Sequence, residues 1–176
     1  MTRLELACDR FARWDLAVCE RFNRASRRPP IRLLFAAVSR LADGLVWYTL
    51  MLILLVWHRS NGVRPVLHMA LAGGVCTLFY KGLKHATARP RPCDACAQIQ
   101  RRARPLDQFS FPSGHTLHAV AFSLVASAYY PGLLWLLVPY TLLVALSRRV
   151  LGLHYPTDAL AGGALGAVIA ALSFIV

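Results

Sequence analysis

Three short polar clusters interrupt an otherwise apolar chain, and each carries side chains that can handle a phosphate group. The first is KHATARPRP at residues 84–92, which contains Lys84, Arg89 and Arg91. A guanidinium is a planar fork that can donate to two phosphate oxygens at once, and an ammonium adds a compact positive charge. Taken alone, this cluster is equally consistent with a basic patch that holds lipid headgroups at a membrane surface.

The second cluster is PSGH at residues 112–115, where a long apolar run begins. Proline and glycine beside a helix start leave backbone N–H groups free, and these groups together with the helix dipole favour an anion. Ser113 can add a hydroxyl donor, and His115 can protonate a leaving oxygen. Alone, the pattern is also consistent with an ordinary N-cap.

The third cluster is SRRVLGLHYPTD at residues 147–158. Asp158 follows His154 by four positions, so its carboxylate can bind one imidazole nitrogen and leave the other as a nucleophile. Asp158 is one of only eight acidic residues and stands where an apolar segment begins, which makes it a functional candidate. Arg148 adds a further guanidinium for phosphate.

Together the clusters supply what phosphoryl transfer through a phosphohistidine requires. Cations and backbone donors can offset charge on the equatorial oxygens, one histidine can act as acid, and a carboxylate-paired histidine can act as nucleophile. The chain has no cluster of carboxylates suited to Mg²⁺. The CDAC pair, Cys93 and Cys96, lacks the further ligands that a zinc site requires. We therefore expect a reaction without a metal or any other cofactor.

The elements that must position these clusters are membrane helices. The chain has 176 residues, is 57% hydrophobic and 16% charged, and has a mean hydropathy of +0.47. Its apolar blocks approach the roughly 20 residues that cross a bilayer core. We expect an all-α integral membrane bundle of about five transmembrane helices, forming a single domain over residues 1–176. The expected spans are 44–58, 65–84, 114–130, a segment that contains Pro139 and ends near residue 149, and 158–176.

Residues 1–42 carry no catalytic motif, and their mixture of apolar and charged residues predicts an amphipathic helix in the membrane interface. The RRPP sequence at 27–30 is expected to break that helix, and the start of the chain lacks the apolar core of a signal peptide. Gly162 and Gly166 form a GxxxG pattern, which indicates a helix-packing face.

Because successive spans alternate in direction, all three polar clusters are expected on one side of the membrane. The net charge of +12 would suggest nucleic acid for a soluble protein. Here the basic residues lie between apolar blocks, so the expected partners are the bilayer and an anionic lipid substrate, and nucleic acid is not expected.

The motifs K-x6-RP at 84–92, PSGH at 112–115 and SR-x5-H-x3-D at 147–158 resemble the tripartite signature of the type 2 phosphatidic acid phosphatases. That superfamily also includes the vanadium haloperoxidases. The resemblance implies that His154 attacks phosphorus, Asp158 orients it and His115 protonates the leaving group. The residues implied to hold the phosphate are Lys84, Arg91, Ser113, the Gly114 backbone N–H and Arg148, while Arg89 lies outside the core signature.

The resemblance implies a lipid phosphatase of the bacterial inner membrane. The layout is similar to small members that dephosphorylate undecaprenyl pyrophosphate, and phosphatidylglycerophosphate, phosphatidic acid and lipid A phosphates are alternative substrates. A lipid phosphotransferase would carry the same residues, whereas a non-catalytic lipid-binding protein would not require His154. The positive-inside rule favours a cytoplasmic site. Relatives usually face the other side, where Cys93 and Cys96 could be oxidised, so we expect an extracytoplasmic site.

Overall fold

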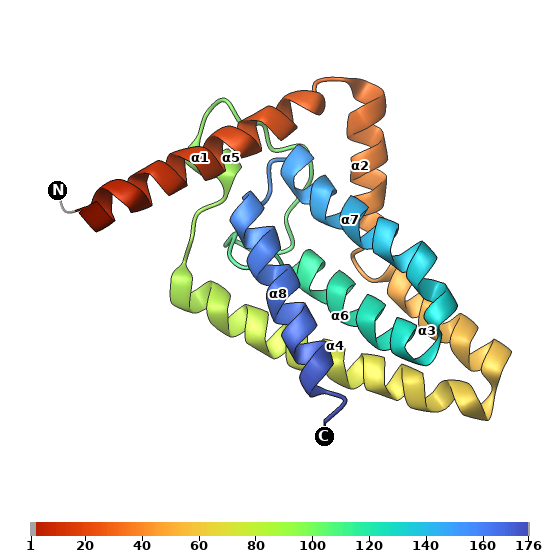
Figure 1. The fold of residues 1–176 in the computed structure, drawn as a ribbon. Helices are drawn as coiled ribbons and strands as arrows, with labels where there is room; N and C mark the ends of the chain where they lie inside the picture. Colours follow the sequence, from red (N-terminus) through yellow and green to blue (C-terminus); the bar gives the residue numbers. More distant parts are fainter. Residues whose placement is uncertain (1–2, 176) are drawn as a thin grey trace.

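Every regular element between residues 3 and 175, the part of the chain that the structure describes, is a helix, so the expected all-α class is confirmed. In this computed structural model the elements are arranged as a bundle with α1 along one end (Figure 1). They are α1 (Arg3–Ala25), α2 (Pro29–Leu41), α3 (Leu45–His58), α4 (Ser60–Thr87), α5 (Pro92–Ala95), α6 (Gly114–Tyr129), the 3₁₀ helix η1 (Pro131–Leu133), α7 (Leu134–Val150) and α8 (Pro156–Leu172).

The amphipathic N-terminal region consists of two helices, and the predicted break between them is confirmed. Prolines occupy the first positions of α2, where a missing N–H costs no intrahelical hydrogen bond. The bend between α2 and α3 is 51°. It is made at Gly44, whose φ of 139° is a conformation that residues with a side chain rarely adopt. Asp43 lies in this corner, between the end of α2 and the beginning of α3.

The apolar helices α3, α4, α6, α7 and α8 correspond to the five expected spans, with shifted ends. By length and composition, Ser60–Ala95 and Pro131–Val150 can each cross a membrane, and the bent pair α2–α3 is a third candidate. A count of five crossings therefore stays a prediction. The connection between the spans expected at 44–58 and 65–84 is shorter than these bounds imply, because α4 already begins at Ser60. Gly62 permits this, since a Cβ there would lie 2.2 Å from the Leu54 carbonyl oxygen.

The central helix is α6, which packs against α4, α7 and α8. Gly162 and Gly166 bring α8 onto it: a Cβ at these positions would lie 2.5 Å from Ser113 O and 2.4 Å from Leu117 O, respectively. The packing face that the GxxxG pattern predicts is therefore confirmed. The same approach lets the Ser113 N–H donate to Asp158 O at 3.0 Å, which joins the second and third motifs.

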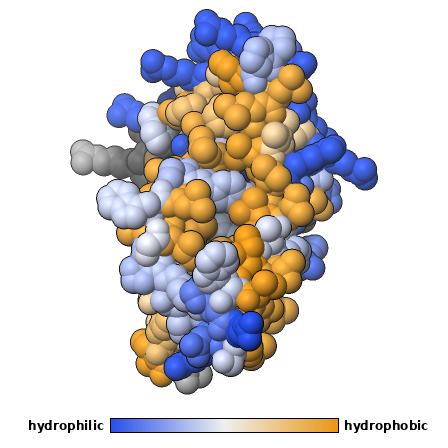
Figure 2. Space-filling view, turned by 90° about the vertical axis from the view of Figure 1, so that its right-hand side faces the viewer, coloured by the Kyte–Doolittle hydropathy of each residue, from blue (hydrophilic) through white to orange (hydrophobic). Residues whose placement is uncertain are grey.

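Large apolar side chains remain exposed on the outside of the bundle, including Trp135, Trp57 and Leu78. Figure 2 shows hydrophobic residues over much of one face, with hydrophilic residues at its top and also at its sides and lower end. Apolar surface of this extent is typical of contact with lipid. Together with the candidate spans, it defines a multi-span membrane protein.

Candidate active site

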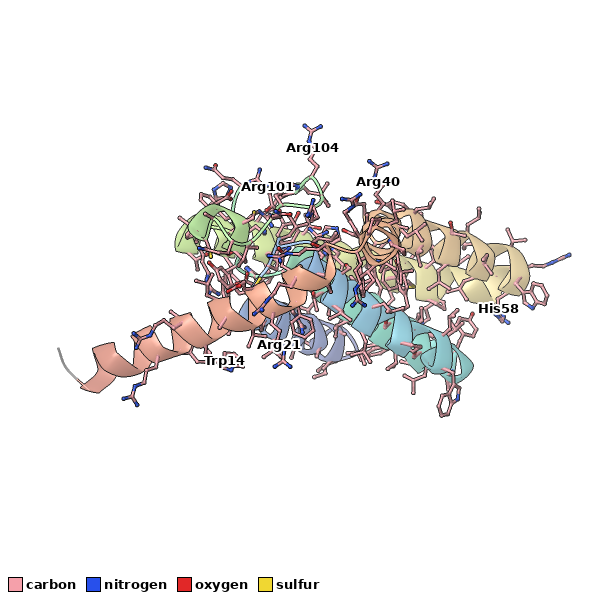
Figure 3. All side chains as sticks on the ribbon, turned by 90° about the horizontal axis from the view of Figure 1, so that it is seen from above. Trp14, Arg21, Arg40, His58, Arg101 and Arg104 are labelled. Carbon is pink, nitrogen blue, oxygen red and sulfur yellow. The ribbon has the colours of Figure 1, made fainter. Side chains whose placement is uncertain are left out.

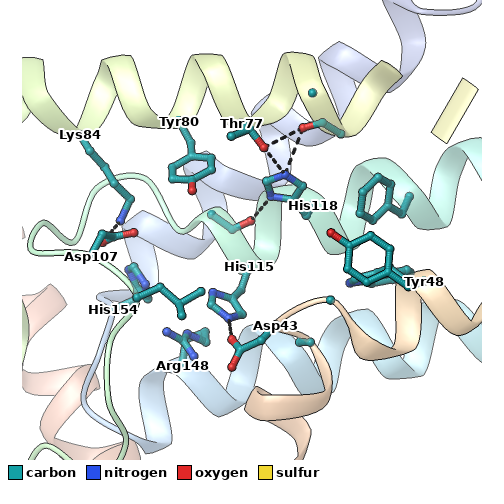
Figure 4. Close-up of a pocket in the computed structure, with 18 of the residues that line it drawn as sticks. Asp43, Tyr48, Thr77, Tyr80, Lys84, Asp107, His115, His118, Arg148 and His154 are labelled. Carbon is teal, nitrogen blue, oxygen red and sulfur yellow. Dashed lines mark hydrogen bonds and ion pairs between the residues drawn. The ribbon is translucent and has the colours of Figure 1, made fainter. Parts of the chain in front are cut away.

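A cavity of about 460 Å³ lies where the N-terminus of α6 meets α3, α4 and the end of α7 (Figure 4). One end of it is polar and the other is lined by apolar and aromatic side chains. The sequence-predicted site residues that line the cavity are Lys84, Arg91, Gly114, His115, Arg148 and His154. The fold therefore brings all three motifs to one cavity.

His154 lies in the short connection between α7 and α8. The chain turns there at Gly152, whose φ is 74°, and the N–H groups of Leu153 and His154 donate to Arg148 O at 2.9 and 3.2 Å. The side chain is almost completely buried, and its Nε2 lies 3.4 Å from Arg91 Nη1. Burial of the ring is the main cause that holds the pKa of His154 well below its usual range, and the positive charges of Arg148 and Arg91 lower it further. The imidazole is therefore neutral, which is the state that the predicted nucleophilic role requires.

Asp158 faces His154 at the beginning of α8. Its Oδ2 lies 3.6 Å from His154 Nδ1, which is longer than an N–H···O hydrogen bond, and this Nδ1 has no hydrogen-bond partner among the described residues. Oδ2 instead accepts from the Tyr155 N–H at 2.9 Å, and Oδ1 accepts from Arg89 Nη1 at 2.7 Å. The two side chains of the expected pair are adjacent, but the hydrogen bond between them is not formed in this structure.

Lys84 and Arg91 share an acceptor that the sequence motifs do not include. Lys84 Nζ and Arg91 Nη2 each donate to Asp107 Oδ1 at 2.7 Å. Arg91 Nη1 also donates to Leu153 O at 2.7 Å, which ties this guanidinium to the His154 loop. Burial raises the pKa of Asp107, but the hydrogen bond and charge of Lys84 and the charge of Arg91 outweigh it and lower that pKa. Asp107 is thus an ionised carboxylate among the predicted phosphate-binding cations.

His115 also has a carboxylate partner, which sequence reasoning missed. Its Nε2–H donates to Asp43 Oδ1 at 2.5 Å, across 72 positions of the chain. The site therefore holds two histidines that each have an aspartate beside them, His115 with Asp43 and His154 with Asp158. Asp43 and Asp107 are two of only eight acidic residues. Their scarcity in a strongly basic chain is the one signal that could have drawn attention to them.

Arg148 and Gly114 complete the polar end of the cavity. Arg148 is buried in the last turn of α7, and its Nη1 donates to Ser39 Oγ on α2. Gly114 is the first residue of α6, so its N–H belongs to the first turn, which has no intrahelical acceptors. Ser113 differs from the expectation: it is fully buried, it is not among the lining residues, and its hydroxyl pairs with Thr116 Oγ1 at 3.0 Å.

Arg89 lies behind the cavity and does not line it. Its guanidinium stacks over the Tyr155 ring, 4.0 Å from the centroid. It donates to Asp158 on one side and to Asp15 of α1 on the other, at 2.7 Å each. In this arrangement Arg89 contacts the carboxylate beside His154, whereas Lys84, Arg91 and Arg148 line the cavity.

Comparison with known proteins agrees with this site. The model of the PAP2 superfamily matches residues 62–176, and the chain belongs to that superfamily. The match covers all three motifs, so the resemblance noted in the sequence is confirmed, as is the expected enzyme class of a PAP2-type phosphatase.

One sequence relative and two solved structures are similar to this chain. The undecaprenyl-diphosphatase of Sulfolobus acidocaldarius is 26% identical over 141 residues, which are 80% of this chain and 68% of the relative. The crystal structure of Aquifex aeolicus LpxE aligns with a TM-score of 0.79 at 26% identity and covers 92% of this chain and 94% of its own. The transmembrane PAP2-type phosphatidylglycerolphosphate phosphatase of Bacillus subtilis has the same fold. It aligns with a TM-score of 0.75 at 24% identity and covers 98% of this chain and 86% of its own.

Proposed function

We propose that this chain hydrolyses a phosphate monoester or pyrophosphate of a lipid, with undecaprenyl pyrophosphate or a similar polyprenyl pyrophosphate as the preferred substrate. The proposal rests on the two-part cavity, in which cations and two histidines lie at one end and an apolar wall lies next to them. Trp47, Tyr48 and Met51 of α3 and Phe122 of α6 contribute to that wall. A phosphate can therefore bind at the polar end while an attached hydrocarbon chain lies along the helices. The similarity to the undecaprenyl-diphosphatase of Sulfolobus acidocaldarius supports the choice of substrate.

The first chemical step is attack of His154 Nε2 on phosphorus. The Nε2–P bond forms as the bond from phosphorus to the leaving oxygen breaks, and His115 gives a proton to that oxygen. Lys84, Arg91 and Arg148 offset the charge on the equatorial oxygens, together with the free N–H groups at the start of α6. Asp158 lies on the Nδ1 side of the ring, where it can stabilise the positive charge that develops on His154.

The second step releases the phosphate. His115, now neutral, takes a proton from water, the water oxygen attacks phosphorus, and the P–Nε2 bond breaks to give inorganic phosphate and free His154. No metal ion is required, because the cations of the site supply the positive charge. The same phosphohistidine would serve a phosphotransferase if a lipid or sugar hydroxyl replaced the water. Phosphatidylglycerophosphate, phosphatidic acid and lipid A phosphates are the alternative substrates.

We place the enzyme in the bacterial inner membrane with its site on the extracytoplasmic side. Asp107 and the proposed substrate pair with several of the basic residues on that side. These residues therefore weigh less in the positive-inside rule, which would otherwise favour a cytoplasmic site. A single domain over residues 1–176 is supported by the contribution of α2, whose Ser39 accepts a hydrogen bond from Arg148.

The test is phosphate release by purified protein in detergent with EDTA, with undecaprenyl pyrophosphate and the three alternative lipids offered separately. His154→Ala is expected to abolish release. His85→Ala is the matched control, because His85 is exposed and lies outside the cavity lining. Release that survives in His154→Ala would overturn the phosphohistidine mechanism. Loss of all release in EDTA, restored by a divalent cation, would overturn the metal-free reaction.

A further inference from the structure

The N-terminal helix α1 turns a polar stripe towards the catalytic loop. Asp15, Cys19 and Asn23 follow one another at intervals of four residues and therefore share one face of the helix. All three are buried, whereas Phe11 and Trp14 are exposed. In Figure 3, Trp14 and Arg21 lie on the side of α1 away from the loop that carries Arg101 and Arg104. An interfacial helix ordinarily directs its polar face to water, so a buried polar stripe indicates a specific partner.

Each residue of the stripe contacts a segment that carries the active site. Asn23 Nδ2 donates to Gln100 O and to Val150 O at 3.0 Å, and its Oδ1 accepts from the Gln100 N–H at 2.8 Å. Cys19 Sγ lies 3.6 Å from the carbonyl oxygen of His154. The helix is therefore attached to both ends of the connection that holds the proposed nucleophile.

Asp15 accepts three hydrogen bonds, and one of them comes from a guanidinium that also contacts Asp158. Its Oδ2 accepts from Arg89 Nη2 at 2.7 Å and from Thr157 Oγ1 at 2.5 Å, and its Oδ1 accepts from the Thr157 N–H at 3.2 Å. The other nitrogen of the same guanidinium, Arg89 Nη1, donates to Asp158 Oδ1 at 2.7 Å. Arg89 thus bridges two fully buried carboxylates, and the second of them faces His154.

The net charge of this bridge depends on Asp15. With Arg89 alone, the positive guanidinium would cancel the negative charge of Asp158. Asp15 contributes a second negative charge and shares the guanidinium, so a net negative charge remains behind His154. A negative charge at this position stabilises the positive charge that His154 acquires as it attacks phosphorus.

We propose that Asp15 is a positioning residue of the active site. It acts through Arg89 to keep the Asp158 carboxylate in position and negatively charged beside His154. The proposal rests on the proposed function, in which His154 is the nucleophile. It makes α1 a working part of the enzyme in addition to an interfacial helix. The cavity cations Lys84, Arg91 and Arg148 do not contact Asp15, so substrate binding should not depend on it.

The test compares Asp15→Asn with Asn23→Ala, a control on the same face of α1. Asn23→Ala loses the three side-chain hydrogen bonds of Asn23 but leaves Arg89 unchanged. We expect Asp15→Asn to lower kcat by about tenfold with little change in KM. We also expect the acid limb of its kcat/KM profile to move to lower pH, because a lost negative charge favours neutral His154. Asn23→Ala should leave that limb in place.

The charged or titratable groups around His154 are Lys84, Arg89, Arg91, Asp107, His115, Arg148, Asp158, Asp15 and Cys19.

The outcomes separate this proposal from the proposed function. Wild-type kcat and an unmoved limb in Asp15→Asn, or equal losses in both variants with no movement of the limb, would overturn the positioning role. Full activity of His154→Ala would instead overturn the mechanism beneath it. Should Asp15→Asn fail to fold, Arg89→Lys decides, because an ammonium keeps the charge but cannot bridge two carboxylates as a fork. A fall in kcat at constant KM supports the role, and wild-type kcat refutes it.

Discussion

Asp107 accepts a hydrogen bond from Lys84 Nζ at 2.7 Å through the same oxygen that accepts from Arg91. Two of the cations assigned to phosphate are thus already paired with an internal carboxylate. A phosphate entering the cavity must take these donors from Asp107 or share them with it. Because like charges repel across a partly buried site, the carboxylate opposes binding of an anion.

Neutralising Asp107 should therefore tighten phosphate binding. We expect Asp107→Asn to lower the inhibition constant of inorganic phosphate severalfold, because the asparagine keeps the shape of the side chain and removes its charge. Asp94→Asn is the control, since Asp94 pairs with Arg101 on the exposed surface and does not line the cavity. Weaker phosphate binding in Asp107→Asn would mean that the carboxylate mainly aligns Lys84 and Arg91.

The pair formed by Asp43 and His115 predicts a dependence on the leaving group. If Asp43 holds His115 in position as the acid, Asp43→Asn should slow release most when the leaving oxygen is basic. We expect kcat to fall about tenfold for a lipid phosphate monoester, whose leaving group is an alcohol. It should change little for p-nitrophenyl phosphate, from which p-nitrophenolate leaves without a proton. An equal fall for both substrates would contradict the role of the pair in proton donation.

The lowered pKa of His154 predicts the pH range of activity. The nucleophile must be neutral, so activity declines as the pH falls through this pKa. An ordinary histidine would place that decline near pH 6.5. Since burial and the nearby Arg148 and Arg91 lower the pKa of His154, the acid limb of kcat/KM should lie below that value. A stopped assay of phosphate release across the acidic range measures it, and a limb above pH 6.5 would show that the ring is not held neutral in the free enzyme.

The sequence predicted the three motifs and their meeting at one site, and it missed the partners that lie outside those motifs. His154 and Asp158 are four positions apart at a helix start, so their proximity follows from the chain itself. Asp43 meets His115 across 72 positions, and Asp15 meets Thr157 across 142. No pattern within one helix encodes such contacts, because they depend on the bend at Gly44 and on the docking of α1. The ends of the spans shifted for a similar reason, since the α3–α4 turn is set by packing of Gly62 against Leu54.

Accessible thiols offer a test of the proposed sidedness. Cys93 and Cys96 are free and partly exposed in the loop that follows α4. Cys19 is buried. Its burial and, to a smaller extent, the charge of Asp15 raise its pKa to about 12, so this thiol should not react with a maleimide. In a Cys8→Ser background, an impermeant maleimide applied to intact cells should modify the Cys93–Cys96 loop and leave Cys19 unmodified. If these thiols are reduced yet become modified only after the membrane is permeabilised, the site faces the cytoplasm.

The close approach of α8 to α6 predicts contrasting effects at neighbouring glycines. A Cβ at Gly162 would lie 2.5 Å from Ser113 O, whereas a Cβ at Gly163 would lie 3.7 Å from the nearest side-chain atom, in Val120. Gly162→Ala should therefore push the helices apart and lower the free energy of unfolding by about 1–3 kcal/mol, while Gly163→Ala should change it little. Thermal unfolding in detergent measures both. Because the Ser113 N–H donates to Asp158 O, Gly162→Ala should also reduce kcat in the fraction that folds. Equal stability and activity of the two variants would mean that this helix contact does not set the position of Asp158.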